Sequence, residues 1–412
     1  MRDPLRSPAP LTSGLPSPAA PADPLGPSAP PSRRRFLKLT AVGAGAAGIA
    51  GAAGLAGATS AEAVTSGLTS LTHPGVLHSL ADLNRMRTKV AAGAQPWLAG
   101  YNVFAADFFS SSSYVVAGGR ATVTRGTSPE DGNIDLWYDC NAAYQNAVMW
   151  YITQDTAHAY KALEIIKSWT NALQTINGAD AELAAGIYGA KLAAAVEIMH
   201  YTGPAGSWTQ SELDATVAMF QNIFVPLINI YGDGGYGLMG LKGMMQIAVA
   251  CNNLSLFNDA YNAFYTNSCC ALTKLVQSGT GQCCESGRDQ GHTQLILGSL
   301  AEICQTGWIQ GLDMFGASNS LLLSGFEYTA KYNLGNTVPY DATFGRCNWH
   351  WSSLSTDGRG AFKPIYEMAY NHYVKRAGKS APYTSQVASN LRPEGAPTQC
   401  DQVGFGTLLF SL

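Results

Sequence analysis

Between residues 139 and 333 the chain repeats one local pattern, in which apolar residues recur at spacings of three and four. This spacing places apolar side chains on one face of an α-helix, and short polar or glycine-containing connections separate the segments. The pattern predicts helices over 139–153, 156–175, 181–201, 209–230, 237–253, 256–278, 289–310 and 316–333. A shorter amphipathic helix is expected over 79–92, and Thr209 with Glu212 matches a capping box.

Helices joined by such short connections predict an all-α fold built from helical hairpins. No fixed-period repeat is visible, which favours a closed (α/α) toroid, an incomplete helical barrel, over a regular solenoid. Residues 105–135 lack periodicity and read as a loop with at most a short strand. After Gly335 we expect an irregular C-terminal tail with one helical piece near 364–376, able to cover one mouth of the toroid.

The first 63 residues have the pattern of a twin-arginine export signal. Arg33-Arg34-Arg35 precede an apolar run, and Ala61-Glu62-Ala63 offers a small-residue cleavage site. The alternative is a membrane anchor, but the Ala/Gly content makes this run only weakly hydrophobic. The proline-rich residues before it read as a disordered leader. We therefore expect removal of 1–63, export by the Tat machinery, no stable membrane insertion afterwards, and a secreted or periplasmic single domain at 64–412.

The charge of the predicted mature chain is mildly negative. Six of the 25 basic and three of the 28 acidic side chains lie in the leader, so residues 64–412 have a formal net charge of −6. No basic stripe of the kind that binds nucleic acid is present, so no nucleic-acid partner is expected. An anionic substrate would depend on local Arg and Lys side chains.

All nine cysteines lie in the predicted mature chain, without the spacing of a zinc site, and no metal or other cofactor is expected. An exported protein permits disulfides. Cys269-Cys270 and Cys283-Cys284 flank a short loop and are the pairs expected to form bridges.

The richest polar cluster is Glu285-Ser286-Gly287-Arg288-Asp289-Gln290-Gly291-His292-Thr293-Gln294, just before an apolar helix. If a residue near Asp289 opens this helix, Arg288 and His292 fall four apart and share a face. An arginine beside an imidazole suits proton abstraction next to a carboxylate, because Arg pairs the carboxylate and helps to keep His neutral. The alternative is a solvated helix cap.

Three other clusters are candidate substrate-binding surfaces. Asn141, Tyr144 and Gln145 could line a cavity from one helix, or could form a capped helix start. Asn348, Trp349 and His350 combine an aromatic ring with hydrogen-bonding groups, as a carbohydrate subsite requires, although a packed loop is equally consistent. Tyr366 and His372 belong to a helical tyrosine stripe that is also typical of a core.

Several segments resemble the secreted alginate-lyase-like proteins. They are AAYQNAVMWYITQDTAHAYKALEIIKSW, SGRDQGHTQLILGSLAEI, WIQGLDMFG, LLLSGFEYTAKYNLGN, PIYEMAYNHY, RPEG and GFGTLLF. The resemblance runs from about His73 to the C-terminus, and the Arg-Asp-Gln-Gly-His-Thr-Gln block is its most specific part. Such proteins are similar to helical-toroid polysaccharide lyases, including alginate and glucuronan lyases.

The resemblance implies cleavage of a uronic-acid polysaccharide by β-elimination, by a monomer that needs no metal. In this chain Arg288 would hold the substrate carboxylate and His292 would act as base or neutraliser. Tyr144 is the expected general acid, with Tyr236 and Tyr366 as rivals.

One departure from the family pattern concerns the residues before the helix at 237. Relatives often carry Gly-Asn-Trp there, whereas this chain has Gly234-Gly235-Tyr236. Asn141 or Asn348 would then supply the amide, or the chemistry is altered. A toroid glycoside hydrolase and a non-catalytic protein that binds acidic glycans are the alternative functions.

Overall fold

The structure, a computed structural model, describes residues 64–397 and 400–412. The predicted leader and signal peptide lie outside the described residues. The described part is mostly helical with little strand, which confirms the all-α prediction. Its helices are α1 (Leu80–Ala91), α2 (Trp97–Ala105), α3 (Asn133–Thr153), α4 (Thr156–Ala172), α5 (Ala181–Thr202), α6 (Gln210–Met219), α7 (Gly235–Ala250), α8 (Leu254–Thr266), α9 (Leu272–Leu275), α10 (Gln290–Ile309), α11 (Ala317–Asn333), α12 (Tyr366–Tyr370), α13 (Pro382–Leu391) and α14 (Gly406–Leu409).

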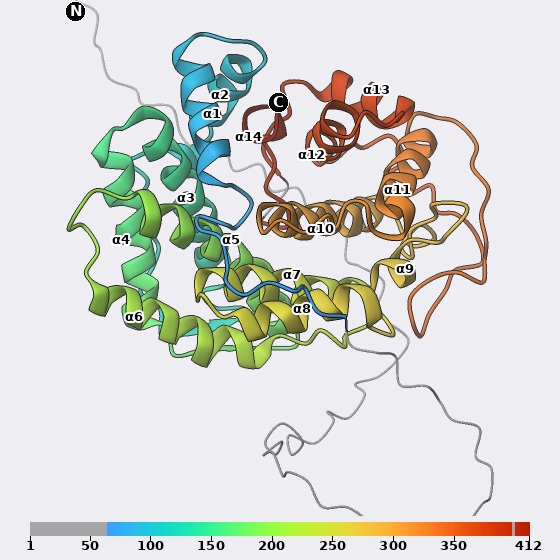
Figure 1. The fold of residues 1–412 in the computed structure, drawn as a ribbon. Helices are drawn as coiled ribbons and strands as arrows, with labels where there is room; N and C mark the ends of the chain where they lie inside the picture. Colours follow the sequence, from blue (N-terminus) through green and yellow to red (C-terminus); the bar gives the residue numbers. More distant parts are fainter. Residues whose placement is uncertain (1–63, 398–399) are drawn as a thin grey trace, which may run out of the picture. The chain divides into compact units, whose positions relative to one another are not determined.

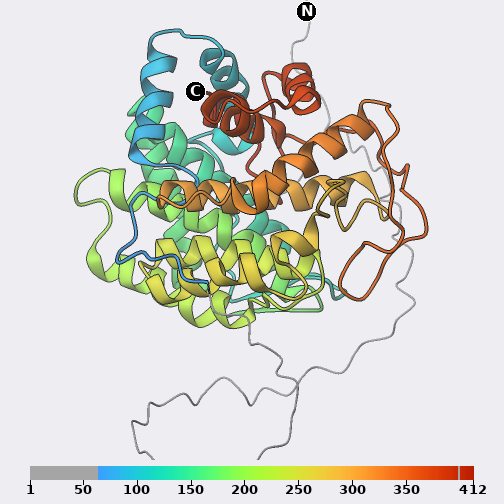
Figure 2. The same cartoon turned by 45° about the vertical axis from the view of Figure 1, so that its right-hand side comes forward.

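Helices α3, α5, α7 and α10 form the inner layer of a helical toroid. Each packs on the next, while α4, α8 and α11 pack outside α3, α7 and α10 respectively. Figures 1 and 2 show this arrangement, with α4, α6, α8 and α11 at the periphery. The inner helices are buried nearly all round, as in α5, where every residue from 184 to 199 is buried. A helix that is apolar on all faces is stable only inside such a double layer.

Local capping explains where several helices begin. The Thr209–Glu212 capping box is confirmed, and Ser79 with Asp82 forms another at the start of α1. The Asp155 side chain accepts a hydrogen bond from the Ala157 N–H, which caps α4. These side chains satisfy backbone N–H groups that have no partner within the helix.

Two predicted helices are shorter than their apolar patterns. The helix expected over 209–230 is divided into three pieces: α6 ends at Met219, a π-helix follows at Phe220–Phe224, and a 3₁₀ turn at Val225–Leu227 contains Pro226. The helix expected over 256–278 ends at Thr266. There the Asn267 side chain accepts hydrogen bonds from the N–H groups of Cys269 and Cys270, which turns the chain.

The predicted irregular tail after Gly335 is confirmed, and buried glutamines hold it in place. Gln282 bonds to both the N–H and the C=O of Asp341, at 2.7 and 2.9 Å. Gln294 does the same with Ala361 C=O and Lys363 N–H, at 3.0 and 2.8 Å. A glutamine amide can replace the partners that a strand or helix would supply, so this segment needs no secondary structure of its own.

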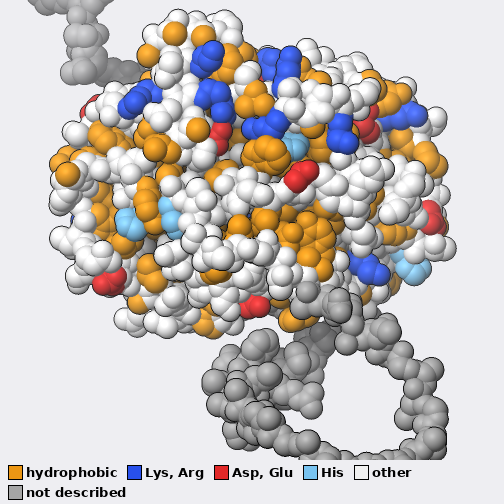
Figure 3. Space-filling model, viewed as in Figure 1, with side chains coloured by type: hydrophobic (Ala, Val, Ile, Leu, Met, Phe, Trp, Pro, Cys, Tyr) orange, Lys and Arg blue, Asp and Glu red, His pale blue; other side chains and the backbone are white. Residues whose placement is uncertain are grey.

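The surface charge is unevenly distributed. On the face seen in Figure 3, Lys and Arg side chains gather along the upper edge, while acidic side chains are scattered singly. The negative net charge is therefore not concentrated on this face, which leaves local basic groups free to act on an anion. No described helix is long and apolar enough to span a membrane.

The segment before α1 is tied to α5 by an ion pair. His73 Nδ1 lies 3.0 Å from Glu197 Oε2, and Glu197 is only 1% exposed. Burial acts to lower the pKa of His73, but the hydrogen bond and the charge of Glu197 outweigh it and raise the pKa above its ordinary value of 6.5. The charged pair therefore contributes fully below pH 6.5, and its contribution is lost as pH rises through the raised pKa.

We predict that His73→Gln destabilises the protein more at pH 6 than at pH 9. Urea unfolding of the wild type and the variant at both pH values measures this difference. Since desolvation lowers the pKa of His200, the His200→Gln control should not show this dependence. Equal destabilisation by His73→Gln at both pH values would mean that the pair is not charged.

Candidate functional site

The N-terminal ends of the four inner helices meet at one side of the toroid. Strands β1 (Thr122–Thr124) and β2 (Thr175–Asn177), which precede α3 and α5, pair in parallel. The Tyr236 hydroxyl at the start of α7 donates to Asp180 Oδ1 at the start of α5, at 2.9 Å. A Cβ at Gly234 would lie 3.4 Å from Glu285 Oε1, just before α10. We call this region the mouth; the aligned helix dipoles make it favourable for anions.

Asp289 and His292 form a hydrogen-bonded pair in the mouth. Asp289 is the N-cap of α10, and its carboxylate accepts from the backbone N–H of His292 and contacts His292 Nδ1, each at 2.6 Å. Burial acts to raise the pKa of Asp289, but the hydrogen bonds from His292 and the nearby charges hold it below its ordinary value. An ionised Asp289 accepts a hydrogen bond from Nδ1–H, which leaves the lone pair on Nε2 of a side chain that is 42% exposed.

The expected pairing of Arg288 with His292 on one helical face is not what the structure has. Helix α10 begins at Gln290, so Arg288 precedes the N-cap and is outside the helix. Arg288 Nε lies 3.6 Å from Asp289 Oδ2, and Arg288 Nη1 lies 4.0 Å from Glu285 Oε2. The carboxylate of Asp289, rather than helical spacing, brings the two side chains together.

The tail contributes a second guanidinium to the mouth. Arg346 pairs with the buried Glu285 in a bidentate way, through Nε at 2.7 Å and Nη2 at 3.1 Å, and lies 5.4 Å from the ring centroid of Trp351. A Cβ at Gly234 would meet Arg346 Cγ at 3.1 Å. Where the resemblance implies an amide, this chain therefore has a glycine turn packed against an ion pair.

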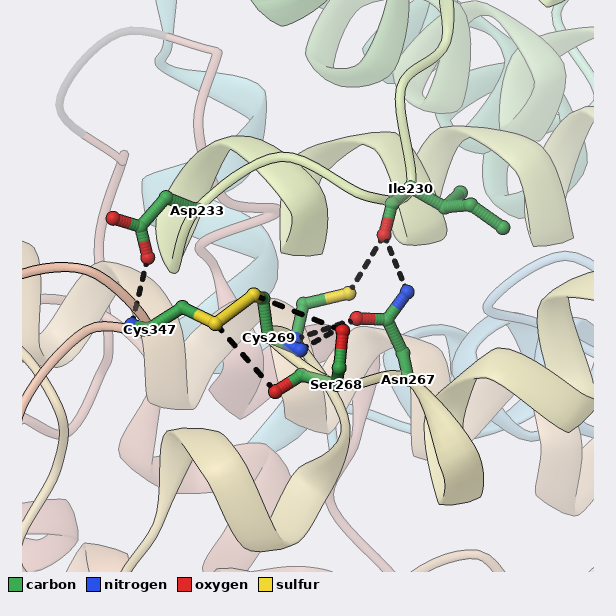
Figure 4. Close-up of a disulfide and its surroundings, with 7 residues drawn as sticks. Ile230, Asp233, Asn267, Ser268, Cys269 and Cys347 are labelled. Atoms are coloured by element: carbon green, nitrogen blue, oxygen red, sulfur yellow. Dashed lines mark hydrogen bonds between the residues drawn. A yellow bond between two sulfur atoms is a disulfide. The ribbon is translucent and has the colours of Figure 1, made fainter. Parts of the chain in front are cut away.

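A disulfide fixes the tail at this point, and it differs from the expected pairs. Cys269 is bonded to Cys347, whereas Cys270, Cys283 and Cys284 are free and buried. Figure 4 shows the bridge, with Asp233 accepting a hydrogen bond from the Cys347 N–H. The thiol of Cys270 lies 3.1 Å from Ile230 O. The prediction was wrong because bridging depends on the approach of a segment 78 residues further along the chain.

The three candidates on α3 lie in the interior. Tyr144 is 1% exposed, and its hydroxyl is 2.6 Å from His78 Nε2. Gln145 accepts a hydrogen bond from the Ser110 hydroxyl, and Asn141 is also buried. None of these side chains is placed to contact a polymer at the surface, because α3 is an inner helix packed on both sides.

Of the rival tyrosines, only Tyr236 faces the mouth. Tyr366 is fully buried, with its hydroxyl 3.2 Å from Gln294 Oε1, so it belongs to the core. Tyr236 is half-buried. Burial and the neighbouring Asp180 raise the pKa of Tyr236 to about 12, which keeps the phenol protonated at neutral pH.

The remaining candidates lie at opposite ends of the toroid. Asn348, Trp349 and His350 are exposed directly after the disulfide and form a rim beside the mouth. His372 instead stacks on Phe315, with ring centroids 3.8 Å apart, and lies beside Trp308 near the C-terminal end of α10. Burial, then the charge of Arg376, lowers its pKa to about 4. His372 is therefore far from the mouth.

Arg125, Asp180 and Asp401 are mouth residues that sequence reasoning missed. Arg125 follows β1, Asp180 precedes α5, and Asp401 lies in the tail. Burial raises the pKa of Asp401, although the charges of Lys242, Arg125 and His292, among others, act to lower it. All three stand in irregular segments without a motif. Only the assembled toroid brings them together.

No family model matches the sequence, and no curated protein matches it either. Solved structures do match. Alginate lyase A1-III from Sphingomonas species A1 superposes with a TM-score of 0.59 over 84% of this chain and 98% of its own, at 13% identity. An alginate lyase from Bacteroides ovatus gives a TM-score of 0.57 over 83% of this chain and all of its own, also at 13% identity.

The chain has the fold of the alginate lyases. Further matches are complexes of the A1-III enzyme with a tetrasaccharide, one of a histidine-to-alanine variant and one of a tyrosine-to-phenylalanine variant. At this identity the likeness establishes the alginate-lyase fold alone.

We predict that removing the bridge with Cys269→Ser/Cys347→Ser lowers the free energy of unfolding by about 2–4 kcal/mol, because the bridge closes a long loop. Amide hydrogen exchange should become faster in residues 341–351, while α5 and α7 keep their protection. Cys251→Ser, which changes a free and partly exposed cysteine, is the control. Unchanged exchange in 341–351 would show that the buried glutamines hold this segment without the bridge.

Proposed function

We propose that this protein is a polysaccharide lyase that cleaves a uronic-acid polysaccharide, such as alginate or polyglucuronate, by β-elimination. The observation that carries the proposal is the Asp289–His292 pair, which presents a basic imidazole nitrogen at the mouth. Guanidinium groups and a half-buried phenol surround this pair. The fold of the alginate lyases supports the same conclusion.

Each step of the elimination has a candidate group in the mouth. Positive charge from Arg288 neutralises the uronate carboxylate, which makes the C5 proton more acidic. His292 Nε2 removes that proton, and the electron pair forms the C4–C5 double bond as the C4–O4 bond breaks. Tyr236 donates its proton to the departing O4 and is regenerated from solvent.

The proposed base is a histidine and the proposed acid is a tyrosine, and alginate lyase A1-III also contains both residue types. Its tetrasaccharide complexes are of variants in which one histidine or one tyrosine is replaced. We assign Tyr236 rather than Tyr144 or Tyr366 as the acid, since the other two are buried. The exposed Asn348, Trp349 and His350 would bind sugar units next to the cleaved bond.

We also propose that the enzyme works outside the cytoplasm as a monomer, exported by the twin-arginine route. The support is Arg33-Arg34-Arg35 with the following apolar run and the site at Ala61-Glu62-Ala63.

Incubation with alginate or polyglucuronate should raise the ultraviolet absorbance, because the new double bond is conjugated with the carboxylate. His292→Ala should lower the rate by about 10²–10⁴-fold, the usual contribution of a general base. His200→Ala, at the far end of α5, is the matched control and should keep the rate.

A flat trace for the wild type on every polyuronate would contradict the lyase. New reducing ends without absorbance would then indicate a glycoside hydrolase. Binding without either product would indicate a glycan-binding protein.

Tyr236→Phe should lower kcat by about 10²-fold or more and leave KM within a few-fold, because the lost proton acts only in the transition state. Tyr231→Phe, five residues earlier and 68% exposed, should behave as the wild type. Steady-state kinetics by absorbance measure both variants. A Tyr236→Phe enzyme with unchanged kcat would exclude this phenol as the acid.

A further inference from the structure

Arg125 reaches the mouth from the segment after β1, and its backbone is firmly held there. Its N–H donates to Asn177 O at 2.9 Å, and its C=O accepts from Asp180 N–H at 3.1 Å. Both bonds lead to the residues just before α5. The position of the Arg125 side chain therefore follows the N-terminal end of an inner helix.

The guanidinium of Arg125 lacks the partners that the other mouth arginines have. Its Nη1 is buried, and among the residues that the structure describes it has no hydrogen-bond partner. Arg346 pairs with Glu285, Arg288 lies beside Asp289, and Arg120 bonds to Asp131 and Asp135. The guanidinium carbon of Arg125 lies 5.3 Å from the centroid of the Tyr188 ring.

A buried N–H without an acceptor is unfavourable, and the penalty is larger on a charged group. Such groups are rare in folded proteins and indicate that a partner is missing. A planar guanidinium with unused donors is best satisfied by a carboxylate, which it can bind through two oxygens.

The charge of Arg125 acts on the groups of the proposed reaction. It lowers the pKa of Tyr236 against the larger effects of burial and Asp180, and it acts on Asp401, which also lies within range of His292. The charges of Arg125 and His292 thus both act on the carboxylate of Asp401. Glu182, Lys242 and Lys363 are the other charged groups that act on Tyr236 or Asp401.

We propose that Arg125 binds the carboxylate of a uronate unit next to the one that Arg288 neutralises. This inference rests on the proposed function. Arg288 already lies beside Asp289 and Glu285, whereas the buried Nη1 of Arg125 has no hydrogen-bond partner among the described residues. The ligand class is therefore a polyuronate, and neutral polysaccharides of the same linkage should bind weakly.

The test compares Arg125→Ala, Arg125→Lys and Arg87→Ala for binding to alginate, to polyglucuronate and to the same polymers after reduction of their carboxyl groups. Arg87 is the matched control, because its guanidinium carbon lies 5.1 Å from the ring of Tyr151 in an equivalent ring contact on α1. Isothermal titration uses each variant in the His292→Ala background, so that no polymer is consumed. Thermal unfolding checks that each variant is folded.

Arg125→Ala should weaken binding of the acidic polymer by about 10–100-fold, as expected for a charged hydrogen bond, and leave binding of the reduced polymer unchanged. Arg125→Lys should recover part of the affinity, and Arg87→Ala should bind as the parent does. Equal affinities for Arg125→Ala and Arg87→Ala would overturn the proposal.

The outcomes also separate this inference from the lyase activity. Carboxylate-dependent binding that is lost in Arg125→Ala, without any rise in absorbance for the wild type, supports the Arg125 site and overturns the lyase. A rise in absorbance for the wild type, together with normal binding of the acidic polymer by Arg125→Ala, supports the lyase and overturns the Arg125 site. A parent protein that binds acidic and reduced polymers equally overturns the Arg125 site.

Discussion

Helices α5 and α7 approach each other so closely that only glycine fits at their crossing. A Cβ on Gly186 would lie 2.4 Å from Met239 O, and one on Gly243 would lie 2.7 Å from Gly186 Cα. This contact sets the spacing of the inner layer, because α3 packs on α5 and α10 packs on α7. It also places the starts of α5 and α7 side by side, so that Tyr236 can reach Asp180.

The inner surface of the toroid is polar, and the tail supplies its partners. Lys191 and Lys242 are almost completely buried, and their ammonium groups donate to Gln402 O at 2.7 Å and Asp401 O at 2.8 Å. Glu302 accepts from Val403 N–H at 2.9 Å. Backbone groups of the tail thus compensate charged side chains that would otherwise be costly to bury. The same insertion brings Asp401 toward the mouth.

Helical periodicity and capping patterns predicted most of the architecture. The segments expected over 139–153 and 181–201 became α3 and α5, because each apolar run is long enough to bury a full helix. The apolar spacing did not predict that α6 changes to a π-helix and a 3₁₀ turn after Met219, or that the turn at Asn267 ends α8 at Thr266. For Asn141, Tyr144 and Gln145 the sequence left a cavity wall and a capped helix start both open, and the structure buries all three side chains on an inner helix.

The sequence by itself determined the helices and the polar block around His292, because spacing, caps and motifs act over a few neighbouring residues. It indicated Arg288, His292 and the aromatic segment at 348–350 as candidates. Only the tertiary structure decided that Cys269 meets Cys347, that Tyr236 faces Asp180, and that Arg125 Nη1 is buried without a hydrogen-bond partner among the described residues. Those contacts join segments at least 50 residues apart, and their approach depends on how the helices pack rather than on any local pattern.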